Sequence, residues 1–213
     1  TEADLPAESS GSGAIGVALR RVSDGRYLTF KTRSTDGSQF WETINIGSDE
    51  LSTLVEDGET YTLDFIDFHS GGWGWAALDS VIIDQGSIAA PQQPIVQFDF
   101  NDRSLQDWVL EMGSDVEGGP TELGIISDDD PAVGNSVPPL ALSAPSFVGP
   151  VPFEAEDGDN ARDRSHQTLL LRSPAFRLLP EATISFALIG GSKPNFDLEV
   201  FQTQADLPAE SAG

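Results

Sequence analysis

Short runs of alternating apolar and polar residues recur along the chain, separated by turns rich in Gly, Asp and Pro. Alternation with a period of two is typical of strands that bury one face. Residues 14–20 and 26–33 flank the turn signal Ser23-Asp24-Gly25, which predicts a hairpin. The remaining predicted strands are residues 40–46, 60–68, 76–83, 95–100, 168–171, 175–179, 182–189 and 196–202.

Almost no segment has the periodicity of an amphipathic helix, so the pattern predicts an all-β chain. Short strands separated by turns are typical of an antiparallel β-sandwich or jelly roll. Residues 113–160 are polar and rich in Pro and Asp. We expect them to form long loops that carry one or two short strands.

The two ends of the chain carry nearly the same sequence. Residues 1–11 are TEADLPAESSG and residues 203–213 are TQADLPAESAG, so nine of eleven positions agree at an offset of 202 residues. Such a match indicates an internal repeat, and it predicts that the chain is one period of a longer tandem array plus a short overlap. The alternative is a duplicated linker or a cloning scar.

A change in composition divides the chain into two parts. Residues 84–94, DQGSIAAPQQP, hold two prolines and three glutamines and no aromatic residue, which is typical of a linker. Residues 1–83 are therefore predicted to be the C-terminal half of one repeat. Residues 95–213 are predicted to be the N-terminal half of the next.

This division has a consequence for assembly. Two half-domains would hold incomplete sheets, whose open edges favour pairing with a neighbour. The array is then either one polypeptide of many modules or a set of chains that exchange strands into a head-to-tail filament. The alternative is that the two halves pack on each other within this chain as a permuted sandwich.

Taken in module order, several motifs resemble those of MAM-type (concanavalin-like) jelly rolls. They are FDFNDRSLQDW at 98–108, LLLRSPAF at 169–176, ISFALIGG at 184–191, and the segments 61–68 and 72–83, the latter GWGWAALDSVII. The resemblance implies a jelly-roll fold and a cation near the first and last strands, which would bring in Asp79, Asp99 and Asp102. The chain lacks the paired cysteines of the animal family and carries a long acidic insertion.

Charge narrows the classes of partner. The chain has 35 acidic and 11 basic side chains, a formal net charge of −24. Nucleic acid is excluded as a partner because phosphate binding needs a basic face.

No apolar run approaches the roughly 20 residues that span a bilayer, so membrane insertion is not expected. The absence of cysteine excludes a disulfide framework and thiol catalysis.

Such an acidic chain favours hard cations as cofactors. Residues 154–163 gather Asp157, Asp159, Asn160 and Asp163, and Ca²⁺ takes six to eight oxygen ligands of this kind. These four residues, with Asp79 and Asp99, are the candidate calcium ligands. The alternative is a solvated acidic face on a salt-adapted protein.

Trp73 and Trp75 lie among glycines in the segment GGWGW at 71–75. Stacked tryptophans suit the apolar faces of sugar rings, which supports an alternative function as a carbohydrate-binding module. The other interpretation is that one or both tryptophans fill the core, as bulky aromatic residues usually do.

Catalysis has the weakest support. No Gly-x-Ser-x-Gly motif accompanies the two histidines, His69 and His166, and nothing singles out a pair among the 35 carboxylates. We therefore predict that the chain is not an enzyme. The predicted function is a structural repeat of an extracellular filament or giant adhesin at the cell surface, which assembles with copies of itself and is stiffened by calcium. Glycans are the additional partner under the carbohydrate-binding alternative.

Overall fold

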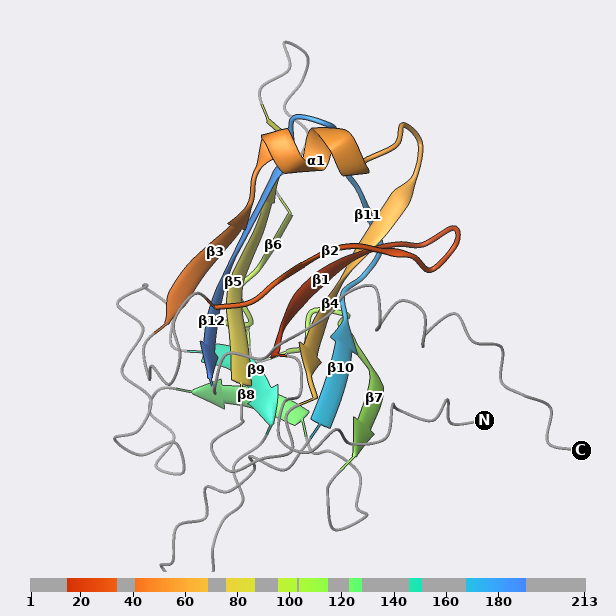
Figure 1. Ribbon diagram of the computed structural model, residues 1–213. Coiled ribbons are helices and arrows are strands. Elements are labelled where there is room, and N and C mark those ends of the chain that lie inside the picture. The colour runs from red at the N-terminus through yellow and green to blue at the C-terminus, as the bar shows by residue number, and fades with distance from the viewer. Residues whose placement is uncertain are drawn as a thin grey trace, which may run out of the picture.

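The computed structural model describes residues 15–33, 41–68, 76–86, 96–102, 104–114, 123–127, 146–150 and 168–190. In these ranges the chain forms short strands and one helix (Figure 1). The strands are β1 (Ile15–Arg21), β2 (Tyr27–Lys31), β3 (Glu42–Ile46), β4 (Thr60–Asp67), β5 (Ala76–Asp84), β6 (Val96–Phe98), β7 (Val109–Ser114), β8 (Leu123–Ser127), β9 (Ser146–Pro150), β10 (Thr168–Arg172), β11 (Phe176–Arg177) and β12 (Thr183–Gly190); the helix is α1 (Ser48–Leu54).

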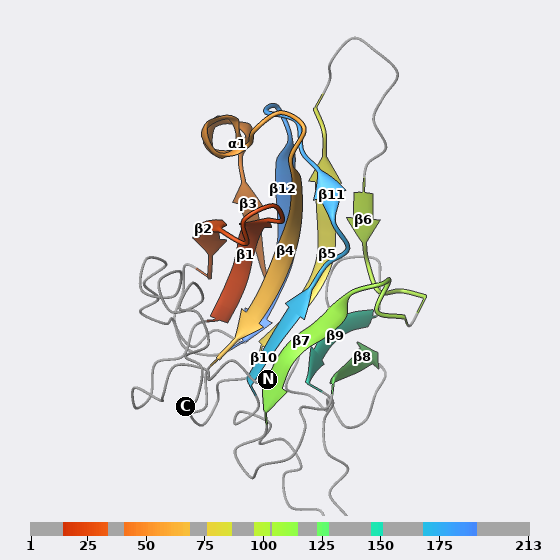
Figure 2. The same ribbon diagram turned by 90° about the vertical axis from the view of Figure 1, so that its right-hand side faces the viewer.

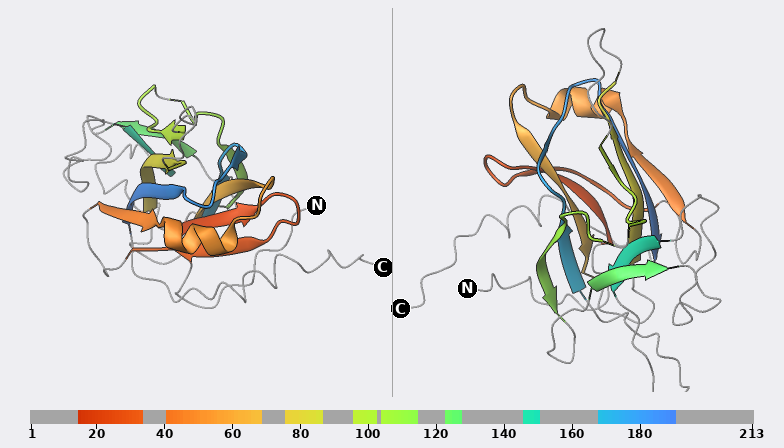
Figure 3. Two further views of the ribbon diagram at one scale, coloured as in Figure 1. Left: turned by 90° about the horizontal axis from the view of Figure 1, so that it is seen from above. Right: turned by 180° about the vertical axis from the view of Figure 1, so that it is seen from behind.

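The strands build two antiparallel sheets that lie face to face (Figure 2; Figure 3, left). The first sheet has the order β2-β1-β4-β10-β7, and β11 also pairs with β4. The second sheet has the order β3-β12-β5-β9-β8, and β6 also pairs with β5. This architecture confirms the predicted all-β antiparallel sandwich.

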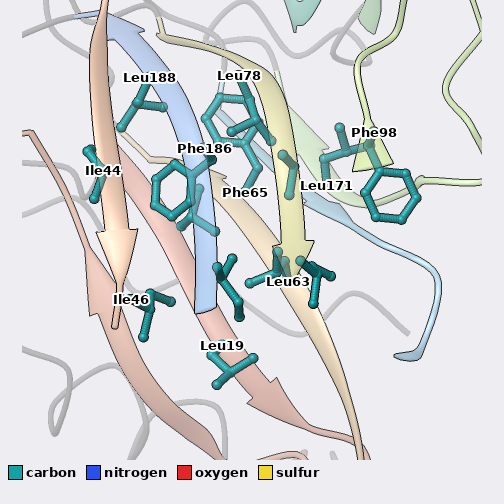
Figure 4. Close-up of a cluster of buried hydrophobic side chains, with 14 of the residues drawn as sticks. Leu19, Ile44, Ile46, Leu63, Phe65, Leu78, Phe98, Leu171, Phe186 and Leu188 are labelled. Atoms are coloured by element: carbon teal, nitrogen blue, oxygen red, sulfur yellow. The ribbon is translucent and has the colours of Figure 1, made fainter. Parts of the chain in front are cut away.

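The main hydrophobic core lies between the sheets (Figure 4). Leu19 of β1 and Phe65 of β4 enter it from the first sheet, and both are fully buried. Ile184, Phe186 and Leu188, alternate residues of β12, enter it from the second. Full burial of an aliphatic or aromatic side chain of this size contributes about 1.5–3 kcal/mol, so this core is the main source of stability.

Both halves of the chain contribute strands to both sheets. We call β1–β5 the first half and β6–β12 the second half, because residues 87–95 separate them. β12 of the second half lies between β3 and β5 of the first, and β10 pairs with β4. Within one chain the halves therefore pack on each other, as the permuted-sandwich alternative expects. The assignment of 1–83 and 95–213 to two different repeats, with a linker at 84–94, stays a prediction.

The sequence pattern missed strand β7 and helix α1. Helix α1 follows β3 directly. Asp49 and Glu50 lie in its first turn, where their negative charges interact favourably with the positive end of the helix dipole. Its Leu51 is fully buried and anchors it to the core. No helix in the described ranges is long and apolar enough to cross a lipid bilayer. β8 and β9 are short strands within the predicted loop region, and the predicted strand 196–202 lies outside the described residues.

The outer face of the first sheet carries a second apolar cluster that contains Ala18, Tyr27, Ile66 and Leu170, with Phe30 packed against it. Gly16, on β1, leaves the space that Phe30 occupies. A Cβ atom at Gly16 would come within 2.5 Å of the Phe30 ring and 2.2 Å of the Lys31 carbonyl oxygen. Small residues on β1 therefore allow the side chains of β2 to lie across it.

We predict that Gly16→Ala lowers the free energy of unfolding by about 1–3 kcal/mol, because the added methyl group overpacks the β1–β2 contact. The matched control is Gly47→Ala, where an added Cβ meets nothing within 4 Å and the change should stay below about 1 kcal/mol. Urea unfolding monitored by circular dichroism measures both values. Equal losses in the two variants would contradict this packing.

Candidate functional site: the interface between the two halves

The central contact between the halves is the insertion of β12 into the second sheet. On one side Phe186 pairs with Ile44 of β3, and on the other Leu188 pairs with Leu78 of β5. β12 therefore satisfies its backbone through two strands that belong to the first half. Its apolar face supplies the core, so one strand provides both hydrogen bonds and hydrophobic burial.

In the first sheet, the second half pairs with one side of β4. β10 pairs with its end, β11 pairs with its beginning, and Ser173 lies between them. The Ser173 backbone N–H donates to the Leu63 carbonyl oxygen at 2.9 Å, and the Leu63 N–H donates to the Ser173 hydroxyl oxygen at 2.9 Å. The serine side chain thus completes the ladder where the strand is interrupted.

A buried ion pair joins the halves on the outer face of the first sheet. Arg172 donates from Nε to Asp64 Oδ1 at 2.9 Å and from Nη2 to Asp64 Oδ2 at 2.8 Å. The Asp64 side chain is fully buried, and that of Arg172 is 22% exposed. Two parallel charge-assisted hydrogen bonds fix both the distance and the orientation of the strands. Because β4 belongs to the first half and β10 to the second, this pair selects their register.

Tyr27 extends the network to β2. Its hydroxyl donates to Asp64 Oδ2 at 2.6 Å. Burial, followed by the negative charge of Asp64 and the hydrogen bond to it, raises the pKa of the Tyr27 phenol well above its ordinary value. The phenol therefore stays a proton donor to Asp64 across the range in which most proteins are stable.

Gln85 links the end of the first half to the turn before β12. Its Nε2 donates to the Arg177 carbonyl oxygen at 2.7 Å, and the Leu179 N–H donates to its Oε1 at 3.0 Å. Gly86 follows with a φ of 77°, and its backbone lies so close to Glu181 that a Cβ atom would meet the Glu181 carbonyl oxygen at 2.8 Å. The hydrogen bonds of Gln85 and the close approach of Gly86 to Glu181 hold the end of β5 against the turn before β12.

The structure describes two of the six predicted calcium ligands. Asp79 is buried in β5, where its carboxylate accepts hydrogen bonds from the Ser80 N–H at 2.5 Å and the Ser80 hydroxyl at 3.2 Å. Asp99 follows β6 and accepts from the Asn101 N–H and from Gln106 Nε2, each at 3.2 Å. Phe98 pairs with Val81, so the two aspartates lie on adjacent strands near the same end of the β5–β6 pair.

The other predicted site residues lie outside the described residues. These are Asp157, Asp159, Asn160 and Asp163 for calcium, and Trp73 and Trp75 for sugar. In the part of the chain that the structure describes, no three potential metal-ligating side chains gather into one group. Calcium and glycan binding therefore stay predictions.

The residues of the interface were missed by sequence reasoning. Asp64 lies between Leu63 and Phe65 in β4, and Arg172 directly follows the Leu-rich run 169–171. Each is a charge next to a buried segment, which is a usable signal for a buried pair. Nothing in the sequence shows that the two charges face each other, because 107 residues separate them in the chain.

We predict that Asp64→Asn lowers the free energy of unfolding by about 3 kcal/mol, because it leaves the half-buried Arg172 without its charged partner. The matched control is Glu111→Gln. Glu111 lies 3.4 Å from Arg172 Nη1 but its side chain is 40% exposed, so its loss should cost less than about 1 kcal/mol. Urea unfolding measures the free energy of unfolding of both variants. If Glu111→Gln is as unstable as Asp64→Asn, the buried Asp64–Arg172 contact contributes no more than the exposed one.

Comparison with family models, with curated proteins and with solved structures finds no match to this chain. The resemblance to MAM-type jelly rolls therefore stays a prediction. What is established is the β-sandwich and the contacts by which its two halves complete each other.

Proposed function

We propose that this chain is a structural, non-catalytic repeat of an extracellular filament or giant adhesin, assembled head to tail through shared or swapped β-strands. The observation that carries the proposal is that, in the described ranges, neither half contains a complete sandwich. Each sheet takes strands from both halves, and β12 lies between two strands of the first half. A module of this kind is well suited to linking with a neighbour that offers the same surfaces.

The sequence repeat supplies the neighbour. With a period of 202 residues, the chain after Gly213 would continue with the equivalent of residue 12. Each second half is then flanked by a first half on both sides along the array. A contact that is passed from one copy to the next, and does not close on itself, produces an open filament.

The charge of the chain fits an extended assembly. The 213 residues carry a formal net charge of −24, so neighbouring copies would repel one another, which opposes collapse into a compact mass. Ca²⁺ bound by Asp157, Asp159, Asn160 and Asp163 would offset part of this repulsion and stiffen the array. A cell-surface or secreted location follows from the proposed mechanical role.

The proposal predicts how size grows with the number of repeats. Polypeptides of one, two and four periods should show a radius of gyration that rises in proportion to the number of periods. A single compact globule would instead grow only as about the 0.38 power of length. Small-angle X-ray scattering measures the exponent, and the compact value would refute the filament function.

Calcium binding has its own test. Adding a chelator should lower the melting temperature of the wild-type chain, because a cation bound only to the folded state stabilises it by about 2.7 kcal/mol at one hundred times its dissociation constant. Asp159→Asn should reduce this shift. Asp57→Asn, at an exposed turn position after α1, should leave it unchanged. A wild-type melting temperature that does not respond to the chelator removes calcium from the proposal.

A further inference from the structure

β12 occupies a position that the first half cannot fill by itself. In the order β3-β12-β5, both neighbours of β12 come from the first half, so without β12 these two strands have no strand between them. Ile44 and Ile83 would then lose their cross-strand partners Phe186 and Ile184. The first half therefore presents an acceptor site for one particular strand.

The second half also pairs with the first. β10 pairs with β4 on one side and with β7 of its own half on the other, β11 pairs with β4, and β6 pairs with β5. Phe186 and Leu171 are fully buried in a core that residues of both halves line. The two halves thus form a complementary pair within one chain.

We propose that the second half is exchanged as a unit between neighbouring copies, so that β12 of one copy inserts between β3 and β5 of a second copy of this chain. This inference rests on the proposed function and names the segment that crosses. The contacts in the exchanged sandwich are those of the closed chain, so exchange gives up no core burial.

The chain length on either side of the second half sets how far that half can reach. Nine residues, 87–95, connect Gly86 to Val96, and fully extended they reach about 30 Å. On the far side, residues 191–213 and the equivalents of 12–14 connect Gly190 to β1 of the next copy. In a covalent array a neighbouring half is present at an effective concentration of about 1 mM or more, which favours its capture.

The polar contacts make the exchange specific. The Asp64–Arg172 pair and the two hydrogen bonds of Gln85 all cross between halves, so an exchanged sandwich forms them again only in the native register. A displaced β10 would leave the buried carboxylate of Asp64 without Arg172. The acceptor site therefore discriminates in favour of the same sequence.

Complementation between two damaged full-length chains tests the exchange. Phe65→Asp places a carboxylate in the core from the first half, and Phe186→Asp does so from the second; each variant alone should fail to fold. When both are refolded together, the intact first half of one chain can pair with the intact second half of the other. We expect a heterodimer with about half the wild-type strand signal per chain, because each pair of chains holds one intact sandwich.

The matched control combines two chains that are damaged in the same half. Phe65→Asp refolded with Leu19→Asp offers no intact first half, so this mixture should stay unfolded and form no heterodimer. Circular dichroism measures the folded fraction and native mass spectrometry measures the heterodimer. If the mixture of Phe65→Asp and Phe186→Asp recovers no more signal than the control, exchange is refuted.

The two proposals fail separately. Recovery by complementation together with compact scaling of the multi-period polypeptides would leave exchange standing and remove the filament. Linear scaling without complementation would mean that each repeat closes on itself and that the filament is held by its covalent links alone.

Discussion

The second sheet depends on β12, the last strand of the described chain, which lies between two strands of the first half. β12 lies between β3 and β5, so the second sheet has no continuous hydrogen-bond ladder until residues 183–190 arrive. Its alternating apolar residues also close the core against Leu63 and Phe65 of the opposite sheet (Figure 4). Folding therefore requires contacts of long sequence separation, and the loop-closure entropy is lost before those contacts form.

Apolar burial and polar contacts have different roles at the interface between the halves. The core drives association and opposes a slip of one residue, which would turn the apolar face of a strand outward, but slips of two residues would keep that face buried. The buried polar contacts allow no slip, because a shifted strand would leave these groups buried and unpaired. They are the Asp64–Arg172 pair and the hydrogen bonds of Gln85 to the turn before β12. Affinity thus comes from the core, while the identity of the partner is set by a few buried polar groups.

Most strand positions could be predicted from the local pattern of apolar residues, although β7 was missed. Residues 60–68, 76–83 and 182–189 match β4, β5 and β12 closely. The pairing of strands could not, because alternation says which face is buried and nothing about which neighbour lies beside it. The helix α1 was missed for another reason: it has only seven residues, too few for a helical period to appear.

The candidate site was predictable to a smaller extent. Linker composition predicted a boundary at residues 84–94, but nothing in the sequence shows that Asp64 and Arg172 join the two sides of it. Their role depends on burial, and burial is a property of the completed sandwich. Of the predicted calcium ligands, Asp79 is buried in β5 at an irregularity where Ser80 has a φ of 51°. No sequence pattern predicted this backbone conformation.

Hydrogen exchange of the native chain tests the central role of β12 most directly. If β12 is the strand that completes the second sheet, its backbone amides should be as well protected as those of β4 and should exchange only through global unfolding. Asp64→Asn should then lower the protection of both strands by the same factor. Rapid exchange of β12 amides in a chain whose β1 and β4 amides stay protected would show that the first half is stable without it, and would contradict the account.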